Sequence, residues 1–360
     1  MILTYLFLAA FSIVAVDTTK SFEPDSIPET AEQRIEFDSL PSFGFSRHVV
    51  TDNFGRDVNY YLSNVGDNPV PLVLFIQGSG CNSLFGITPS GRVHGGLQNK
   101  ILDKHSDDVC VMVVEKPGVC FGDRQEGRGI AVGCSDSFLF EHTVERWVEA
   151  LQTALIDAVT RPVEETGIDS TRVLVMGHSE GSDMAAHLVA SVNTDRPGTV
   201  THSALLAGAS VTQLFEMMQL AWRERVSGEL LKDRQARVDN VLEIWRAIQA
   251  DPDNTTEMAW GHPYRRWSSF MTNSAAHSLE QIAREQSDVK IFLAQGTDDA
   301  SSPVESFDAA LARLLIAGGT AEIRRIPGAD HALSIEGQRP IDGLRSIMND
   351  AVEWFLTDSP

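Results

Sequence analysis

Basic residues are scarce in this chain relative to acidic ones. Its 360 residues include 29 Lys and Arg against 50 Asp and Glu, so the formal net charge at pH 7 is −21. Proteins that bind nucleic acid or anionic lipid do so through clustered Lys and Arg side chains. The charge balance therefore argues against both partners, although it does not identify a substrate.

Cysteine is also rare, and the spacing of the four cysteines argues against a zinc site. Cys81, Cys110, Cys120 and Cys134 form no Cys-x-x-Cys pair, which is the common zinc-binding arrangement. In an oxidising compartment, Cys120 and Cys134 are the expected disulfide pair, because they bracket a Gly-rich loop. Cys110 lies in an apolar run and is expected to be a buried free thiol. We expect neither a metal nor another cofactor.

Long apolar runs are lacking except at the N-terminus. Residues 1–16 are almost wholly apolar, but they are fewer than the roughly 20 residues that a membrane-spanning helix needs. The length suits the apolar part of a secretory signal, although no Lys or Arg precedes Lys20 to form the usual basic start. We predict a signal peptide and a secreted or periplasmic protein with no other membrane insertion. An uncleaved N-terminal anchor and a misplaced start codon remain the alternatives.

The remaining chain divides into a polar lead-in and a folded core. Residues 17–45 are polar and contain three prolines, which predicts an extended segment. Beyond them, apolar runs without alternation are separated by helical patterns, as in strands that are buried on both faces of a parallel sheet. We predict an α/β protein with a doubly wound, mostly parallel sheet, formed by residues 46–209 and 285–360. The expected strands include 71–76, 109–114, 172–176, 203–207, 289–294 and 321–326.

Residues 210–284 break this alternation of strand and helix. Helical stripes dominate there, as in the apolar face formed by Val238, Val241, Trp245 and Ile248. We predict a helical cap inserted between two strands of the sheet. Its aromatic residues either pack the cap on the core or line a substrate pocket.

Gly177-His178-Ser179-Glu180-Gly181 fits the G-x-S-x-G pattern of a nucleophile elbow. An apolar run over 172–176 precedes it, and a helical pattern over 182–190 follows it. A sharp turn from strand to helix exposes the serine hydroxyl, and the flanking glycines leave room for the turn. The pattern predicts Ser179 as a nucleophile; the alternative is a Gly-rich turn that contains a serine without a role.

A serine nucleophile needs a base and an acid that orients the base, and these follow the elbow in the order acid, then His. The apolar run ending at Ala294 leads into Gly296-Thr297-Asp298-Asp299. An acid three residues after the glycine selects Asp299 as the triad acid, while Asp298 remains open. The other aspartate would cap the helix that begins near Pro303.

The predicted general base is His331. It lies in Gly328-Ala329-Asp330-His331, directly after the last expected strand, and sites of open α/β sheets gather at such strand ends. His178 directly precedes the nucleophile, and His187 lies on the helix expected after it. Both are expected to have structural roles.

The intermediate of acyl transfer carries an oxyanion that needs hydrogen-bond donors already in place. The backbone N–H of Glu180, directly after the nucleophile, is one expected donor. The second comes from Gln77-Gly78-Ser79-Gly80, at the end of the 71–76 strand. Ser79 N–H is the expected donor from this loop, with Gly80 N–H as the alternative.

Together these motifs resemble those of the α/β-hydrolase superfamily, over residues 46–360 apart from the cap. The resemblance rests on Gln77-Gly78-Ser79-Gly80, Gly177-His178-Ser179-Glu180-Gly181, Gly296-Thr297-Asp298-Asp299 with Pro303, and Gly328-Ala329-Asp330-His331. Gln77 departs from the histidine that is common in the oxyanion loop. The resemblance implies a serine hydrolase that forms an acyl-enzyme on Ser179.

A small-molecule carboxylic ester is the predicted substrate. A peptidase or amidase that acts on short peptides, and a non-catalytic binding protein with the same fold, are the alternatives. The oligomeric state is not indicated.

Overall fold

The computed structural model describes residues 40–358, apart from 64–65, 67, 88–92, 128 and 224–229. The predicted signal segment 1–16 therefore lies outside the described residues. The expected extended segment 17–45 ends earlier than predicted, because its last residues are folded. Leu40–Phe43 form a short 3-10 helix, and the side chains of Leu40 and Phe45 are fully buried in the core.

An eight-stranded sheet forms the centre of the molecule, with strand order β1-β2-β6-β3-β7-β8-β11-β12. β1 and β2 pair antiparallel, β2 and β6 also pair antiparallel, and all other neighbours are parallel. This arrangement confirms the predicted doubly wound, mostly parallel sheet. The strands are β1 (Phe45–Thr51), β2 (Asp57–Ser63), β3 (Val70–Ile76), β6 (Cys110–Val114), β7 (Ile168–His178), β8 (His202–Leu206), β11 (Lys290–Gly296) and β12 (Glu322–Ile326).

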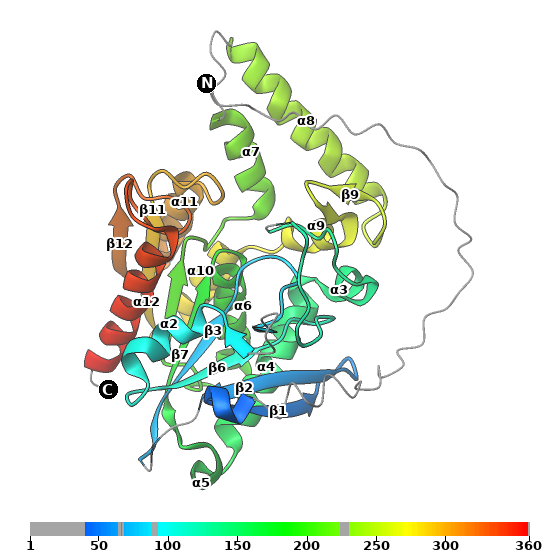
Figure 1. Ribbon diagram of the computed structural model, residues 1–360. Helices are drawn as coiled ribbons and strands as arrows, with labels where there is room; N and C mark the ends of the chain where they lie inside the picture. Colours follow the sequence, from blue (N-terminus) through cyan, green and yellow to red (C-terminus); the bar gives the residue numbers. More distant parts are fainter. Residues whose placement is uncertain are drawn as a thin grey trace.

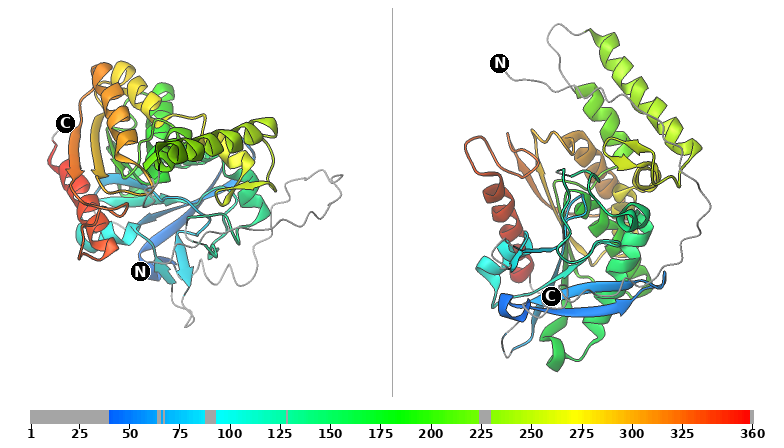
Figure 2. Two further views of the ribbon diagram at one scale, coloured as in Figure 1. Left: turned by 90° about the horizontal axis from the view of Figure 1, so that it is seen from above. Right: turned by 45° about the vertical axis from the view of Figure 1, so that its right-hand side comes forward.

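The central strands β3 and β6 are apolar throughout because helices cover both faces of the sheet (Figures 1 and 2). In β3, Leu72, Leu74 and Ile76 point into one core, whereas Val73 and Phe75 point into the other. Each face therefore buries its own half of every central strand. The first core is covered by α4 (Val144–Thr160), α6 (Glu180–Asp195), α10 (Ala275–Glu285) and α11 (Val304–Ile316), and the second by α2 (Gln98–His105) and α12 (Pro340–Thr357).

The chain leaves the sheet after β8 and forms a mostly helical insertion beyond the strand ends. In Figure 1, α7 and α8 rise away from the sheet, and the short β9–β10 hairpin and α9 lie at their base. α10 lies within the stretch predicted as the cap, yet its apolar face packs into the core with α6 and α11. The insertion comprises α7 (Gln213–Arg223), α8 (Leu231–Ala250), β9 (Met258–Ala259), β10 (His262–Pro263) and α9 (Tyr264–Phe270).

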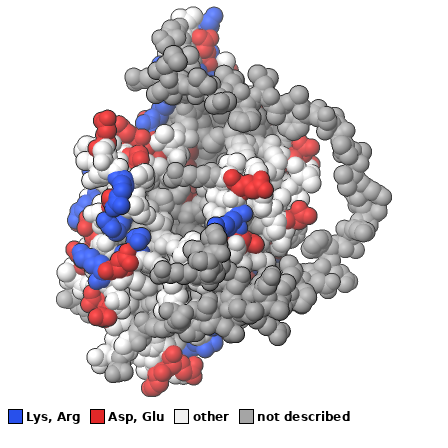
Figure 3. Space-filling model, in the orientation of Figure 1, with Lys and Arg blue, Asp and Glu red and all other residues white. Residues whose placement is uncertain are grey.

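The remaining elements are short and lie outside the main layers. They are α3 (Asp136–Glu141), α5 (Val163–Thr166), and the β4–β5 hairpin (Phe85–Ile87 with Val93–Gly95). No helix in the described part of the chain is long and apolar enough to cross a membrane. On the face that Figure 3 displays, acidic and basic side chains are interspersed over the described residues.

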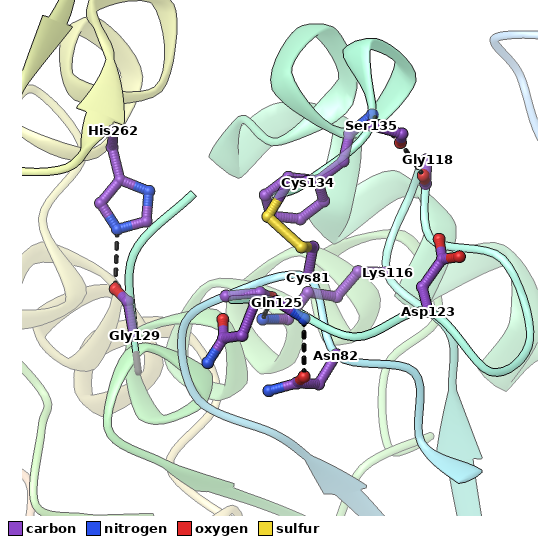
Figure 4. The surroundings of a disulfide bond; sticks show 12 residues. Cys81, Asn82, Lys116, Gly118, Asp123, Gln125, Gly129, Cys134, Ser135 and His262 are labelled. Atoms are coloured by element: carbon purple, nitrogen blue, oxygen red, sulfur yellow. Dashed lines mark hydrogen bonds between the residues drawn. A yellow bond between two sulfur atoms is a disulfide. The ribbon is translucent and has the colours of Figure 1, made fainter. Parts of the chain in front are cut away.

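The disulfide bond joins Cys81 to Cys134, so the predicted pairing of Cys120 with Cys134 is wrong. Cys120 is a half-buried free thiol, and Cys110 is a buried one. The reason is the path of the Gly-rich loop, which folds back along the residues that follow Cys81. Two hydrogen bonds hold the loop there. Ser83 N–H donates to the loop carbonyl Asp123 O (2.9 Å), and the loop group Gln125 N–H donates to Asn82 Oδ1 (3.0 Å), as Figure 4 shows for the second bond.

We expect Cys81→Ala to lower the free energy of unfolding by about 2–4 kcal/mol, because the bond spans 53 residues of the unfolded chain. Urea unfolding followed by circular dichroism measures this loss. Cys120→Ser is the matched control, since it removes a thiol but no cross-link, and its expected loss is below about 1 kcal/mol. Equal losses in the two variants would contradict the pairing.

Candidate active site

Ser179 lies between the end of β7 and the start of α6, on a strained turn. Its backbone has φ 58° and ψ −129°, a conformation that costs a non-glycine residue on the order of 1–3 kcal/mol. The turn is so tight that a Cβ on Gly177 would overlap the carbonyl oxygen of Gly181, and a Cβ on Gly181 would overlap that of Ile76. The two glycines of the motif are therefore required by close approach.

The structure brings the three predicted triad residues together. His331 Nε2 lies 2.8 Å from Ser179 Oγ, and His331 Nδ1 lies 2.9 Å from Asp299 Oδ2. In the tautomer that satisfies both contacts, Nδ1–H donates to the carboxylate and Nε2 accepts the serine hydroxyl proton. This is the arrangement in which a neutral imidazole can deprotonate a hydroxyl.

The loop after β11 holds the Asp299 carboxylate by several donors. The backbone N–H groups of Ser301 and Ser302 donate to Oδ1 at 2.7 and 2.8 Å, and Gln295 Nε2 donates to Oδ2 at 3.1 Å. Burial acts to raise the pKa of Asp299, but the contact with His331 and these backbone donors lower it below its usual value. Asp299 is thus held ionised beside His331.

Asp298, His178 and His187 make none of the contacts between the triad side chains. Asp298 is exposed, and its backbone N–H donates to Ala329 O, so of the two open candidates Asp299 is the one that contacts His331. His178 Nε2 donates to the backbone carbonyl of His331 at 3.0 Å, and His187 Nδ1 contacts Ser278 Oγ at 2.8 Å between α6 and α10.

The predicted oxyanion loop lies against the nucleophile. A Cβ built on Gly78 would be 3.2 Å from Cβ of Ser179, so the loop passes directly beside the elbow. Glu180 is the first residue of α6, where backbone N–H groups have no partner within the helix. Both predicted donors, Ser79 N–H and Glu180 N–H, therefore belong to segments that border Ser179.

A cluster of buried polar and charged side chains surrounds the Glu180 carboxylate. Its Oε1 contacts His142 Nε2 at 2.9 Å, and its Oε2 pairs with Arg266 of α9. Burial alone would raise the pKa of Glu180, but His142, Arg266 and nearby Lys116 hold it well below the usual value. The carboxylate is therefore ionised, and it connects the nucleophile turn to the insertion.

Lys116, His142 and Arg266 are site residues that the sequence does not predict. Arg266 stacks on Trp267 and Phe270, with its guanidinium carbon 4.1 Å from each ring centre. Burial lowers the pKa of His142 to about 4, so its imidazole is neutral at pH 7. One local signal exists: Lys116 comes two residues after a strand that is buried on both faces, where a cation is unusual.

A second contact between the insertion and the core involves Glu216 of α7. Ser302 Oγ, in the loop of the triad acid, donates to Glu216 Oε1 at 2.8 Å. Burial, together with the neighbouring Asp183 carboxyl, raises the pKa of Glu216 well above its usual value. Within the described residues, no group of three or more His, Cys, Asp or Glu side chains is arranged to hold a metal ion.

We expect Arg266→Met to lower the free energy of unfolding by about 3–5 kcal/mol, because it leaves the buried Glu180 carboxylate without its guanidinium partner. Urea unfolding measures the loss. Arg284→Met is the matched control, since it removes an exposed i,i+4 pair with Glu280 that is worth at most about 1 kcal/mol. If Arg266→Met lowered the free energy of unfolding no more than Arg284→Met does, the buried Glu180 carboxylate would not depend on Arg266 for its stability.

Comparisons with known proteins bear on the fold. No family model matches this chain, and no curated protein sequence matches it significantly. Many solved structures are similar to it, and three of them serve as examples. They are a putative dipeptidyl aminopeptidase IV from Bacteroides ovatus (TM-score 0.52, 10% identity, 86% of this chain and 35% of that one), a Pyrococcus horikoshii acylaminoacyl peptidase (0.55, 12%, 89% and 44%) and a Mycobacterium tuberculosis puromycin-hydrolyzing peptidase (0.50, 13%, 86% and 39%).

This chain spans less than half the length of each of these proteins. At such low identity the likeness concerns the arrangement of the backbone. Within this chain, the turn from β7 to α6 that carries Ser179 and the strand-end positions of Asp299 and His331 are those expected of an α/β-hydrolase sheet. The chain has the α/β-hydrolase fold.

Proposed function

We propose that this protein is a serine hydrolase that cleaves an amide or peptide bond through an acyl-enzyme on Ser179. The observation that carries the proposal is the continuous hydrogen-bonded chain from Asp299 through His331 to Ser179 Oγ. A fold that had lost its chemistry would have no reason to keep this geometry. It therefore argues against a binding protein without turnover.

The proposed reaction begins when Ser179 Oγ attacks the acyl carbonyl. His331 Nε2 takes the hydroxyl proton, and the ionised Asp299 stabilises the resulting imidazolium through Nδ1–H. The same Nε2–H then protonates the leaving group as the carbonyl re-forms. Water repeats these steps from the acyl-enzyme and regenerates Ser179.

The oxyanion of the intermediate would be bound by backbone N–H groups of Ser79 and Glu180. Both segments border the nucleophile, and α6 adds the positive end of its helix dipole. Donors of this kind each contribute on the order of 3 kcal/mol to transition-state stability.

The sequence alone favours an ester substrate, whereas the similar structures support the amide alternative. All three are named as peptidases. An amine is a poor leaving group and departs only after protonation, which the His331 imidazolium can supply. We therefore propose short peptides or acylated amines as substrates, with esters as the second candidate. The Cys81–Cys134 bond supports a secreted or periplasmic location.

A fluorophosphonate probe should label Ser179 in the folded protein and fail to label Ser179→Ala. Asp299→Asn should lower kcat on the order of 10⁴-fold, because the amide no longer holds the imidazole in the reactive tautomer. Asp298→Asn is the matched control, with an expected change within about twofold for an exposed site. Absence of labelling, or equal effects of the two substitutions, would contradict the proposed triad.

Aminoacyl anilides and the corresponding aminoacyl esters distinguish the two substrate classes. We expect purified protein to cleave both and Ser179→Ala to cleave neither, since a nucleophile able to expel an amine also expels an alcohol. Turnover of the esters alone would contradict the amide proposal and leave the serine hydrolase in place.

A further inference from the structure

A cavity of about 790 Å³ lies between α7, α8 and the loop that carries the triad acid. Most of its wall area is apolar and comes from Met217, Leu220, Val241 and Trp260 of the insertion and Ala300 of the acid loop, while Arg223, Arg237, Asn240, Asp298 and Asp299 also line it. A volume of this size accommodates a group as large as a small drug molecule. The cavity is therefore suited to a bulky apolar group.

Two walls of this cavity are connected to loops near Ser179. On one side, Asp299 lines the cavity, and it reaches Ser179 through His331. The other wall, Trp260, is at the tip of the β9–β10 hairpin, which packs on the Gly-rich loop. There Gly261 O accepts Ala131 N–H at 2.8 Å.

The Gly-rich loop continues this connection to the oxyanion loop. His262 Nε2 donates to Gly129 O at 2.9 Å (Figure 4), and a Cβ on Gly129 would lie 3.2 Å from Ser79 Oγ. Asp299 and Trp260, which line the cavity, therefore belong to segments that contact the catalytic histidine and, through the Gly-rich loop, the oxyanion loop.

Trp260 has a backbone conformation that its side chain disfavours. Its φ is 46° and that of Gly261 is 82°, and these two residues form the turn that joins β9 to β10. Such turns favour Asn, Asp or Gly at the first position, and other residues there cost roughly 1–2 kcal/mol. The indole packs edge-on against Trp267 with ring centres 5.4 Å apart and faces the cavity.

Local strain of this kind is found where a side chain is kept for its function rather than for its backbone preference. We infer, on the basis of the proposed function, that the cavity binds a bulky apolar group next to the scissile bond and that the Trp260 indole packs against that group. Apolar groups on the acyl side and on the leaving-group side share this chemistry, and the substrates below distinguish them.

The test compares matched substrates with Trp260→Asn. One pair carries an acetyl or a phenylpropionyl acyl group on the same leaving group, and another carries a small or an aromatic leaving group on the same acyl group. We expect kcat/KM of Trp260→Asn to fall about 10–100-fold for the bulky member of one pair and to stay unchanged for its small member. Asn also suits the turn, so thermal unfolding should show no large loss of stability.

Trp222→Ala is the matched control, because Trp222 belongs to α7 but is 41% exposed and does not line the cavity. Its kcat/KM should stay at the wild-type value for every substrate. Equal losses of Trp260→Asn on bulky and small substrates, or none, would overturn the inference. Fluorophosphonate labelling of Ser179 in the same samples separates this result from failure of the proposed function.

A second inference rests on a different residue, Lys116, which follows β6 and is only 1% exposed. Its ammonium donates to the backbone carbonyls of Gly78 (2.5 Å) and Gly80 (2.6 Å) and lies 4.7 Å from the centre of the Trp147 ring. Both carbonyls belong to the oxyanion loop, so a buried cation holds this loop from behind.

The planar trans peptide determines what this contact does. C=O and N–H of one peptide unit point in opposite directions, so a Gly78 carbonyl directed at Lys116 turns the Ser79 N–H away from it. Gly78 and Gly80 are conformationally permissive. Without the ammonium, the peptide between Gly78 and Ser79 can rotate and present a carbonyl where the donor is needed.

We propose that Lys116 is a positioning residue that keeps the Ser79 N–H oriented toward the oxyanion. This proposal also rests on the proposed function. Lys116→Met retains the length of the side chain and removes the donors. We expect kcat to fall about 10²–10³-fold, as for loss of one oxyanion donor, with KM changed little because the ground-state carbonyl depends less on the donor.

Affinity for an alkyl boronic acid, which forms a tetrahedral adduct on the serine, should fall in parallel with kcat. Lys116→Gln retains a neutral donor and should give an intermediate kcat. Lys104→Met is the control, because Lys104 is exposed and pairs with Glu353 on the surface.

Two outcomes would overturn the positioning role. One is an unchanged kcat in folded Lys116→Met, and the other is a fold-change in boronate affinity no larger than the fold-change in KM. Failure of both Lys116 variants to fold would assign Lys116 to stability instead, whereas unlabelled wild-type Ser179 would refute the hydrolase itself.

Discussion

The buried carboxylate of Glu180 is the contact on which the site depends. Its backbone follows the nucleophile, and its side chain pairs with Arg266 of the insertion and with His142 after α3. An ionised carboxylate inside a protein is tolerated only when its charge and its lone pairs are matched. Lys116 adds a further positive charge nearby and holds the oxyanion loop. The nucleophile turn, the oxyanion loop and α9 are therefore fixed relative to one another by one electrostatic requirement.

Two of the contacts that attach the insertion to the core differ in character. Arg266 joins α9 to the elbow through an ion pair, whereas Glu216 joins α7 to the acid loop through a hydrogen bond from Ser302. Burial and the neighbouring Asp183 carboxyl raise the pKa of Glu216 well above its usual value, whereas Arg266 is half of an ion pair. The cap is thus joined to the triad acid loop and to the nucleophile turn through chemically different groups.

Sequence reasoning succeeded where the signal is local. The unbroken apolar runs identified the parallel strands, and the strand ends placed Ser179, Asp299 and His331 at one edge of the sheet. The choice between Asp299 and Asp298 needed the path of the loop, because neighbouring carboxylates differ only in direction. Lys116 and Arg266 have partners 36–38 and 86 residues away, and no spacing rule connects them. The Cys81–Cys134 bond was missed for the same reason, since the fold-back of the Gly-rich loop has no short motif.

The sheet ends on one side at β12, whose outer backbone groups have no neighbouring strand among the described residues. Buried and exposed side chains do not alternate along this strand, which carries Glu322, Arg324 and Arg325. Arg324 pairs with Glu322, and Arg325 pairs with Asp308 of α11. An unpaired strand is a template for other chains, and charged side chains along it oppose such pairing. The polar sequence of β12, which looks unsuited to a sheet, therefore protects the molecule from edge-to-edge aggregation at high concentration.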